Sequence, residues 1–144
     1  MRLKDKVVLV TASTRGIGLA VVKTCAKEGA VVYMAARNLD LAKEEADKLI
    51  AQGYTVKYVY NDAGKPESYI SMVEDVIKSE GRIDVLVNNF GTSNPGKDLD
   101  FQNTDTEVFL DTVNINLRSV FMGSKRRLNI CLNKGEEVSL TFPL

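Results

Sequence analysis

Short apolar runs alternate along this chain with segments whose apolar residues recur at helical spacing. Residues 7–10 are a continuous run of Val and Leu, and residues 30–35, 55–60 and 83–87 are also rich in β-branched or aromatic side chains. A continuous β-branched run bounded by turn residues is typical of a parallel strand that is buried on both faces. We therefore predict four strands, at residues 7–10, 30–35, 55–60 and 83–87.

The segments between these runs predict helices. Residues 16–27 form the first, which Gly29 should end, and residues 41–51 form the second, with Gly53 as its cap. Pro66 suits the first position of a third helix that runs to about residue 80, because its missing amide would be unpaired there anyway. A fourth is expected at 106–124.

Each helix should bury its apolar residues. For the first helix the spacing predicts a buried face of Ile17, Ala20, Val21, Thr24 and Cys25. For the fourth helix it predicts Val108, Phe109, Val113, Leu117 and Phe121.

The order of these elements predicts the fold class. Three consecutive β-α-β crossovers indicate an α/β protein with a doubly wound parallel sheet of the Rossmann type. In such sheets ligands bind outside the carboxyl ends of the strands. Residues that directly follow each strand are therefore the first candidates for a binding site.

The first strand is followed by Thr-Ala-Ser-Thr-Arg-Gly-Ile-Gly at residues 11–18, and a helix begins there. The free amides and the dipole of that helix start form an anion site suited to a pyrophosphate, and the glycines let the backbone approach it. A glycine turn in an unrelated α/β protein is the alternative interpretation. The expected cofactor-binding residues are Thr11, Ser13, Thr14, Arg15, Gly16, Ile17 and Gly18.

The end of the second strand indicates which dinucleotide is used. Arg37 and Asn38 stand where NAD-binding folds carry a carboxylate for the ribose 2′-hydroxyl. With no acid to repel a phosphate, Arg37 can offer its planar fork to the 2′-phosphate of NADP, and Arg15 adds a second cation. A solvated surface arginine is the alternative for Arg37. The sequence predicts NADP as the cofactor.

Polar residues also follow the third and fourth strands. Asp62, with Ala63 beside it, can accept a hydrogen bond from the adenine amino group, although an aspartate after a strand is also a common turn former. Asn88, Asn89, Phe90 and Gly91 follow the fourth strand, and by composition alone they are a turn signal.

These motifs resemble the short-chain dehydrogenase/reductase family, whose loop reads T-G-x-x-x-G-x-G and whose fourth strand is followed by N-N-A-G. Ala12 and Phe90 are departures from that pattern. The resemblance implies that Asn88 and Gly91 border the nucleotide. It also implies that Asn116 is the catalytic asparagine, which holds a water in a proton relay; Asn114 competes for this role.

Within the family, residues 32–39, 56–63, 69–74 and 81–91 resemble the NADP-dependent 7α-hydroxysteroid dehydrogenases of gut clostridia. This resemblance implies a reversible oxidation of the 7α-hydroxyl group of bile acids to the 7-oxo group. It also implies a homotetramer, which this chain is not expected to assemble. Substrate identity depends on the resemblance alone.

Composition narrows the partners and the compartment. The 144 residues are 44% hydrophobic and carry 19 acidic and 19 basic side chains, so nothing favours nucleic acid or an anionic membrane. No run approaches the ~20 apolar residues of a membrane span, and residues 1–6 lack a signal-peptide core. Histidine is absent, and Cys25 and Cys131 have no metal-ligand spacing. We expect a cytoplasmic protein of one domain with no metal.

The last segment differs from the family. The family's chemistry needs a serine and a Tyr-x-x-x-Lys pair, which this sequence lacks. Codons permitted by residues 127–144, read in a shifted frame, allow a glycine turn and the family's next strand, ending in that serine. We therefore divide the chain into a dinucleotide-binding portion, residues 1–124, and an out-of-frame tail, residues 125–144.

Three hypotheses remain for the function of the chain. It derives from an NADP-dependent hydroxysteroid dehydrogenase, it is a module that binds NADP without turnover, or it is the inert product of a broken gene. The missing Tyr-x-x-x-Lys argues that the polypeptide itself is inactive.

Overall fold

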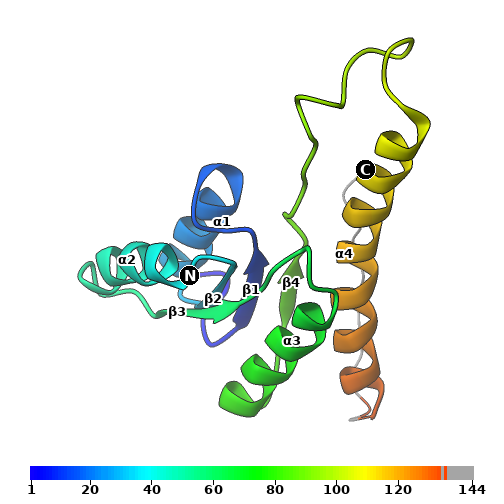
Figure 1. The fold of residues 1–144 in the computed structure, drawn as a ribbon. Helices are drawn as coiled ribbons and strands as arrows, with labels where there is room; N and C mark the ends of the chain where they lie inside the picture. Colours follow the sequence, from blue (N-terminus) through cyan, green and yellow to red (C-terminus); the bar gives the residue numbers. More distant parts are fainter. Residues whose placement is uncertain (134, 136–144) are drawn as a thin grey trace.

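The computed structural model describes residues 1–133 and 135, in which strands and helices alternate (Figure 1). The first strand and helix begin and end close to the predicted residues, and the same holds for the next two pairs. The bounds are β1 (Val7–Thr11), α1 (Gly16–Lys27), β2 (Val31–Ala36), α2 (Leu39–Ile50), β3 (Val56–Tyr60), α3 (Glu67–Glu80), β4 (Val85–Val87) and α4 (Thr106–Asn133).

The four strands form one parallel sheet in the order β3-β2-β1-β4. Val8 of β1 lies opposite Val32 of β2 on one side and Val85 of β4 on the other. The chain therefore extends the sheet outward from β1 in both directions, and the switch point lies between β1 and β4. The predicted doubly wound α/β fold is confirmed.

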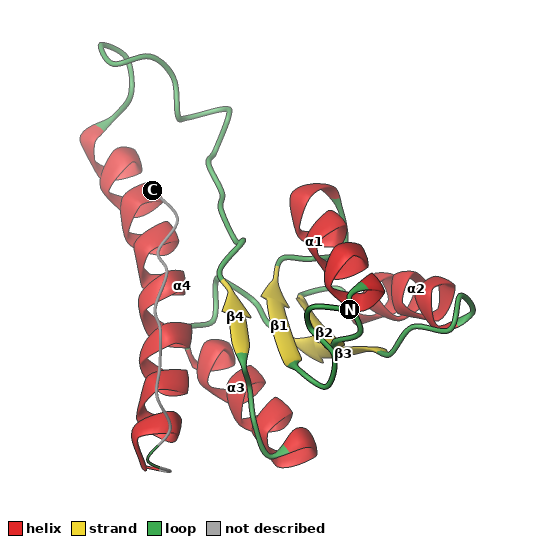
Figure 2. Cartoon of the chain, turned by 180° about the vertical axis from the view of Figure 1, so that it is seen from behind, coloured by secondary structure: helices red, strands yellow, loops and turns green. Residues whose placement is uncertain are grey.

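Two hydrophobic layers enclose the sheet. Val7 and Leu9 of β1 pack with residues of α3 and α4, whereas Val8 and Val10 pack with residues of α1 and α2. Figures 1 and 2 show these helix pairs on opposite sides of the strands. Burial of a Val or Leu side chain contributes about 1.5–3 kcal/mol. The continuous apolar run of β1 thus places the most buried strand at the centre of the sheet.

The buried face of α1 differs from the predicted one. Gly18, Val22 and Ala26 are buried, while Ile17 is 77% exposed. A Cβ on Gly18 would lie 2.8 Å from the Cα of Ser13, so the helix packs against the loop at that point. The prediction of Ile17, Ala20 and Thr24 as core is wrong. Hydrophobic spacing gives weight to large side chains, and it does not detect a helix face that is buried because the backbone comes close to a loop.

The fourth helix extends past its predicted end at residue 124, and α4 continues without a break to Asn133. The predicted core residues Phe109, Leu117 and Phe121 are more than half exposed. Small or polar residues are buried instead, and at Gly123 a Cβ would be in van der Waals contact with Met72, at 3.5 Å, and Leu86, at 3.6 Å. The buried residues of α4 are Ser119, Gly123, Ser124, Arg127 and Cys131. The predicted tail falls partly outside the described residues, at 134 and 136–144, and its out-of-frame origin stays a prediction.

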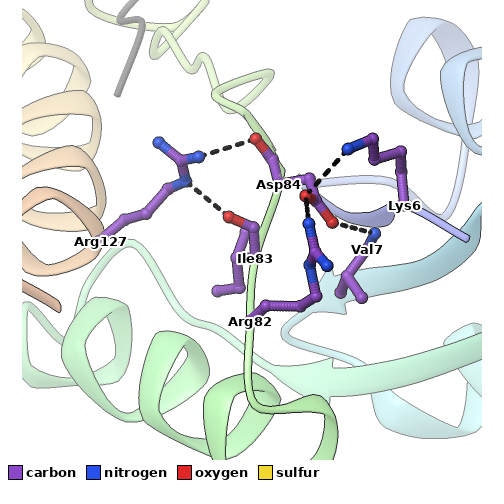
Figure 3. A network of polar contacts seen from close by, with 6 residues as sticks. All are labelled: Lys6, Val7, Arg82, Ile83, Asp84 and Arg127. Carbon is purple, nitrogen blue, oxygen red and sulfur yellow. Dashed lines mark hydrogen bonds and ion pairs between the residues drawn. The ribbon is translucent and has the colours of Figure 1, made fainter. Parts of the chain in front are cut away.

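Side chains hold the beginning of β4 on both of its edges (Figure 3). Asp84 accepts a hydrogen bond from the Val7 amide at 2.8 Å and pairs with Arg82 and Lys6. On the other edge, the buried guanidinium of Arg127 donates to the carbonyls of Ile83, at 3.1 Å, and Asp84, at 2.7 Å. The Asp84 carboxylate takes the amide that a strand partner would otherwise bind, which explains why β4 begins at Val85 and not at the predicted residue 83.

The charge on Asp84 is stabilised in the folded state. Burial raises the pKa of this carboxyl. The hydrogen bonds from Arg82 and the Val7 amide and the charges of Arg82 and Lys6 lower the pKa, and together they outweigh the effect of burial. The net pKa therefore lies below its ordinary value. Because the folded-state pKa is depressed, the stability that this group contributes is present above its unfolded pKa and is lost as pH falls through the folded value.

We predict that Asp84→Ala lowers the free energy of unfolding by about 1–3 kcal/mol at neutral pH, because the buried Val7 amide loses its acceptor. The deficit should narrow as pH falls below the unfolded pKa of ~3.9. Urea titrations at neutral pH and at a pH below that unfolded pKa measure the difference in unfolding free energy between the variant and the unsubstituted chain. Asp75→Ala, at an exposed position on α3, is the control. A deficit that stays constant with pH would contradict the assignment.

Candidate functional site

The loop between β1 and α1 leaves the start of the helix open. Arg15, the residue before the helix, has extended backbone angles, and among the described residues no side chain caps it. Ala12 and Gly16 have positive φ values of 50° and 55°, and around Gly16 a Cβ would find no atom within 4 Å. The first amides of a helix have no partner inside the helix. They are therefore available to an anion, as the sequence predicts.

Asn89 fixes this loop from the neighbouring strand. Its Nδ2 donates to the carbonyls of Thr11 and Ala12, each at 3.1 Å. The Thr11 hydroxyl accepts from the amides of Asn89, at 2.9 Å, and Phe90, at 3.1 Å. The family resemblance implied roles for Asn88 and Gly91 of this motif but none for Asn89. The amide pair in Asn88-Asn89 was the available signal, but only the β1–β4 pairing shows which of the two faces the loop.

Asn88 has another partner. Its Nδ2 donates to the Ser124 hydroxyl at 3.1 Å, which connects the end of β4 to the middle of α4. Ser13 is also occupied, since its buried hydroxyl donates to the Val10 carbonyl at 2.9 Å. Both residues lie at the predicted edge, and their side chains stabilise the protein around the site.

The end of β2 presents one cation and one cap. Arg37 is exposed, as is Arg15 in the loop after β1. Asn38 precedes α2, and its Oδ1 accepts the Leu41 amide at 3.1 Å. Its side chain therefore caps the helix, and Arg37 is the exposed cation that follows β2.

The end of β3 is closed by a tight turn. Asp62 is half-buried, and its Oδ1 accepts the Gly64 amide at 3.0 Å while Oδ2 accepts the Tyr60 hydroxyl at 3.4 Å. The turn-former interpretation is thus correct for one oxygen. Each carboxylate oxygen can accept a second hydrogen bond, so binding to an external donor stays open to it. Ala63 follows, half-buried.

Asn116 joins α4 to the loop that follows β4. Its Oδ1 accepts the Thr92 amide at 2.9 Å, and its Nδ2 donates to the carbonyls of Thr92, at 2.7 Å, and Thr112, at 2.8 Å. Gly91 lies beside it. Asn114 is exposed and makes no corresponding contact in the described part of the chain. The geometry favours Asn116 over Asn114 as the residue connected to the strand ends.

Taken together, the predicted residues follow the carboxyl ends of four adjacent parallel strands. Figure 2 shows the four strands side by side in one sheet. Because the carboxyl ends of parallel strands share one edge, the loop after β1, Arg37, Asp62 and Asn88 follow that edge. A cavity of about 580 Å³ lies next to this edge, and of the candidate residues only Asn114, the competitor of Asn116, belongs to its lining. It is formed by Thr92, Ser93, Asn94, Pro95, Asp111, Thr112, Asn114, Ile115 and Arg118.

Comparison with protein families matches residues 6–138 to the short chain dehydrogenases. The chain belongs to this family. It is 44% identical over 138 residues to a 7alpha-hydroxysteroid dehydrogenase of Paraclostridium sordellii, a match that covers 95% of this chain and 52% of the relative. It is 47% identical over 124 residues to a 7alpha-hydroxysteroid dehydrogenase of Clostridium sardiniense, covering 86% and 47%. The chain spans about half the length of these two relatives.

Solved structures of family members have the same fold. A crystal structure of gox2181 superposes with a TM-score of 0.85 and 30% identity, covering 94% of this chain and 52% of that protein. A variant of actinorhodin polyketide ketoreductase with NADPH superposes with a TM-score of 0.79 and 30% identity, covering 91% and 50%. In the present chain, the residues at the strand ends fit a nicotinamide dinucleotide, because the open start of α1 can take its pyrophosphate.

The described residues offer neither a membrane span nor a metal site. None of the helices there is long and apolar enough to cross a membrane. Nor do His, Cys, Asp or Glu residues gather there in a group of three that could hold a metal ion.

We predict that Gly18→Ala destabilises the chain by about 1–3 kcal/mol, because the new Cβ would lie 2.5 Å from Asn89 Nδ2 and 2.7 Å from the Ala12 carbonyl. Thermal unfolding followed by circular dichroism measures the change. Gly96→Ala is the matched control, since its Cβ would meet its nearest neighbour at 3.7 Å. Equal midpoints for the two variants would show that the loop does not need this close approach.

Proposed function

We propose that this chain binds NADP along the carboxyl edge of its sheet. The observation that carries the proposal is the uncapped start of α1, held open by Asn89 and flanked by the exposed cations Arg15 and Arg37. The amides of the helix start suit the pyrophosphate, and a planar guanidinium suits the 2′-phosphate. Ser13, Thr14 and Ile17 belong to the segment after β1 that holds the pyrophosphate. Asp62 and Ala63 follow β3, where Asp62 accepts the adenine amino group.

We further propose that the chain derives from an NADP-dependent oxidoreductase that interconverts the 7α-hydroxyl and 7-oxo groups of bile acids. The names of the two clostridial relatives support this substrate class. In the whole enzyme Asn116 would position the water of the proton relay through the loop that it binds at Thr92. A cytoplasmic homotetramer is proposed for that enzyme and not for this chain.

The chain alone is proposed to bind the cofactor without turning over a substrate. A nicotinamide cofactor supplies hydride transfer when bound, but the reaction also needs a group that moves the hydroxyl proton. The sequence has no Tyr-x-x-x-Lys to do this. A chain that binds NADP but produces no NADPH with cholate fits this proposal, whereas one that binds no dinucleotide is the inert product of a broken gene.

We predict that Arg37→Gln weakens binding of NADP⁺ by about 10- to 100-fold, since a charge-assisted hydrogen bond contributes about 1.5–3 kcal/mol. Binding of NAD⁺, which lacks the 2′-phosphate, should change little. Isothermal titration calorimetry with both dinucleotides measures the two constants. Lys23→Gln, which removes an exposed cation from α1, is the control. Equal losses for NADP⁺ and NAD⁺ would contradict the assignment of Arg37.

We predict that the coding DNA, read in the shifted frame from the codons near 124–127, encodes a glycine turn, a strand ending in serine, and then Tyr-x-x-x-Lys. Resequencing across the codons of residues 120–144 and the DNA that follows them tests this. A shifted frame that encodes no such strand would refute the proposed origin of residues 125–144, while leaving the binding proposal intact.

A further inference from the structure

Ser68, in the first turn of α3, makes three hydrogen bonds to the two residues that follow β3. Its hydroxyl accepts from the Asp62 amide at 2.9 Å and from Asn61 Nδ2 at 3.2 Å, and it donates to the Asp62 carbonyl at 2.8 Å. A serine hydroxyl has one donor and two acceptor sites, so its full capacity is used. The residue is 3% exposed, which keeps water from replacing these bonds.

These bonds fix the main chain of Asp62 on both sides. Its amide and its carbonyl both end on the Ser68 hydroxyl, and the Lys65 amide also donates to that carbonyl at 2.9 Å. The direction of the Asp62 carboxylate follows from this main-chain position and from the turn bond to Gly64. Ser68 thus acts on the carboxylate without touching it.

The same segment is attached to the neighbouring strand. The Asn61 amide donates to the Ala36 carbonyl at 3.1 Å, and Ala36 directly precedes Arg37. Asn61 is itself buried, so its side-chain amide depends on the Ser68 hydroxyl as an acceptor that the protein supplies. One hydroxyl on α3 therefore organises the ends of two strands at the candidate site.

We propose that Ser68 is a positioning residue for recognition of the adenine ring, acting through Asp62. The inference rests on the proposed function, in which Asp62 accepts the adenine amino group. Without the hydroxyl, the Asp62 amide and the Asn61 side chain lose their acceptor, and the turn shifts to find another. The carboxylate then no longer meets the amino group at hydrogen-bonding distance.

A purely structural role for Ser68 predicts something different. If the residue only supported α3, its loss would weaken binding of every dinucleotide to a similar extent. If it positions Asp62, the loss depends on the amino group of the base. NADP⁺ and its hypoxanthine counterpart separate the two roles, because hypoxanthine has a carbonyl oxygen where adenine has the amino group and offers Asp62 no donor there.

The experiment measures dissociation constants of both dinucleotides for the full chain and three variants. Ser68→Ala should raise the constant for NADP⁺ about 3- to 10-fold, the value of one hydrogen bond, and that for the hypoxanthine dinucleotide less than about twofold. Ser68→Cys keeps the shape of the side chain with a slightly larger atom and offers only a weak donor and acceptor, so the same pattern is expected if the alanine variant does not fold. Ser71→Ala, at an exposed serine on the same helix that donates only to the Ser68 carbonyl, should change neither constant.

The outcomes are distinct. Equal losses for the two dinucleotides, or no loss with a folded Ser68 variant, would overturn the role of Ser68 while the proposed function stands. If the unsubstituted chain binds neither dinucleotide, the proposed function fails and the role of Ser68 fails with it. A loss confined to NADP⁺ supports both.

Discussion

The hydrogen bonds from Asn89 to the loop after β1 are the contacts on which the site depends. They connect the carboxyl ends of β1 and β4, the two strands between which the strand order reverses. The bonds require Gly18, because a Cβ there would displace the Asn89 amide. The open start of α1, the position of Thr11 and the course of the chain after β4 all follow from this arrangement.

The fold could be predicted from the sequence because a buried parallel strand is a short continuous run of apolar residues. The run of Val and Leu at β1 and the turn residues after each helix specify the order of elements almost without ambiguity. The sequence also placed Arg37 and Asp62 at one edge, since in a parallel sheet all carboxyl ends meet there. Whether these residues bind NADP stays a prediction.

Side-chain faces could not be predicted as well. In α1, close packing selects Gly18 and Ala26 over Ile17, and in α4 it selects Gly123 and Ser119 over Leu117 and Phe121. Hydrophobic periodicity measures which residues prefer burial. Gly18 is buried because the helix approaches the backbone of the preceding loop, and Gly123 is buried where α4 packs against the side chains of Met72 and Leu86. The hydrogen bonds of Asn89 and Ser68 could not be predicted either, because each joins two elements whose relative placement the sequence pattern does not give.

The proposed function separates cofactor binding from chemistry in this chain. The strand-end residues proposed to hold NADP are present, while the Tyr-x-x-x-Lys pair of the family is not, and the chain spans about half the length of its clostridial relatives. Large apolar residues of α4, Leu117 and Phe121 among them, are exposed in the part of the chain that the structure describes.

Mapping NADP⁺ binding by amide chemical shifts on the ¹⁵N-labelled chain tests the central claim most directly. The account predicts saturable shifts at residues 13–18, 37–38 and 61–63, along the carboxyl edge of the sheet. Shifts confined to the cavity between residues 92–95 and α4, or no shifts at all, would contradict it.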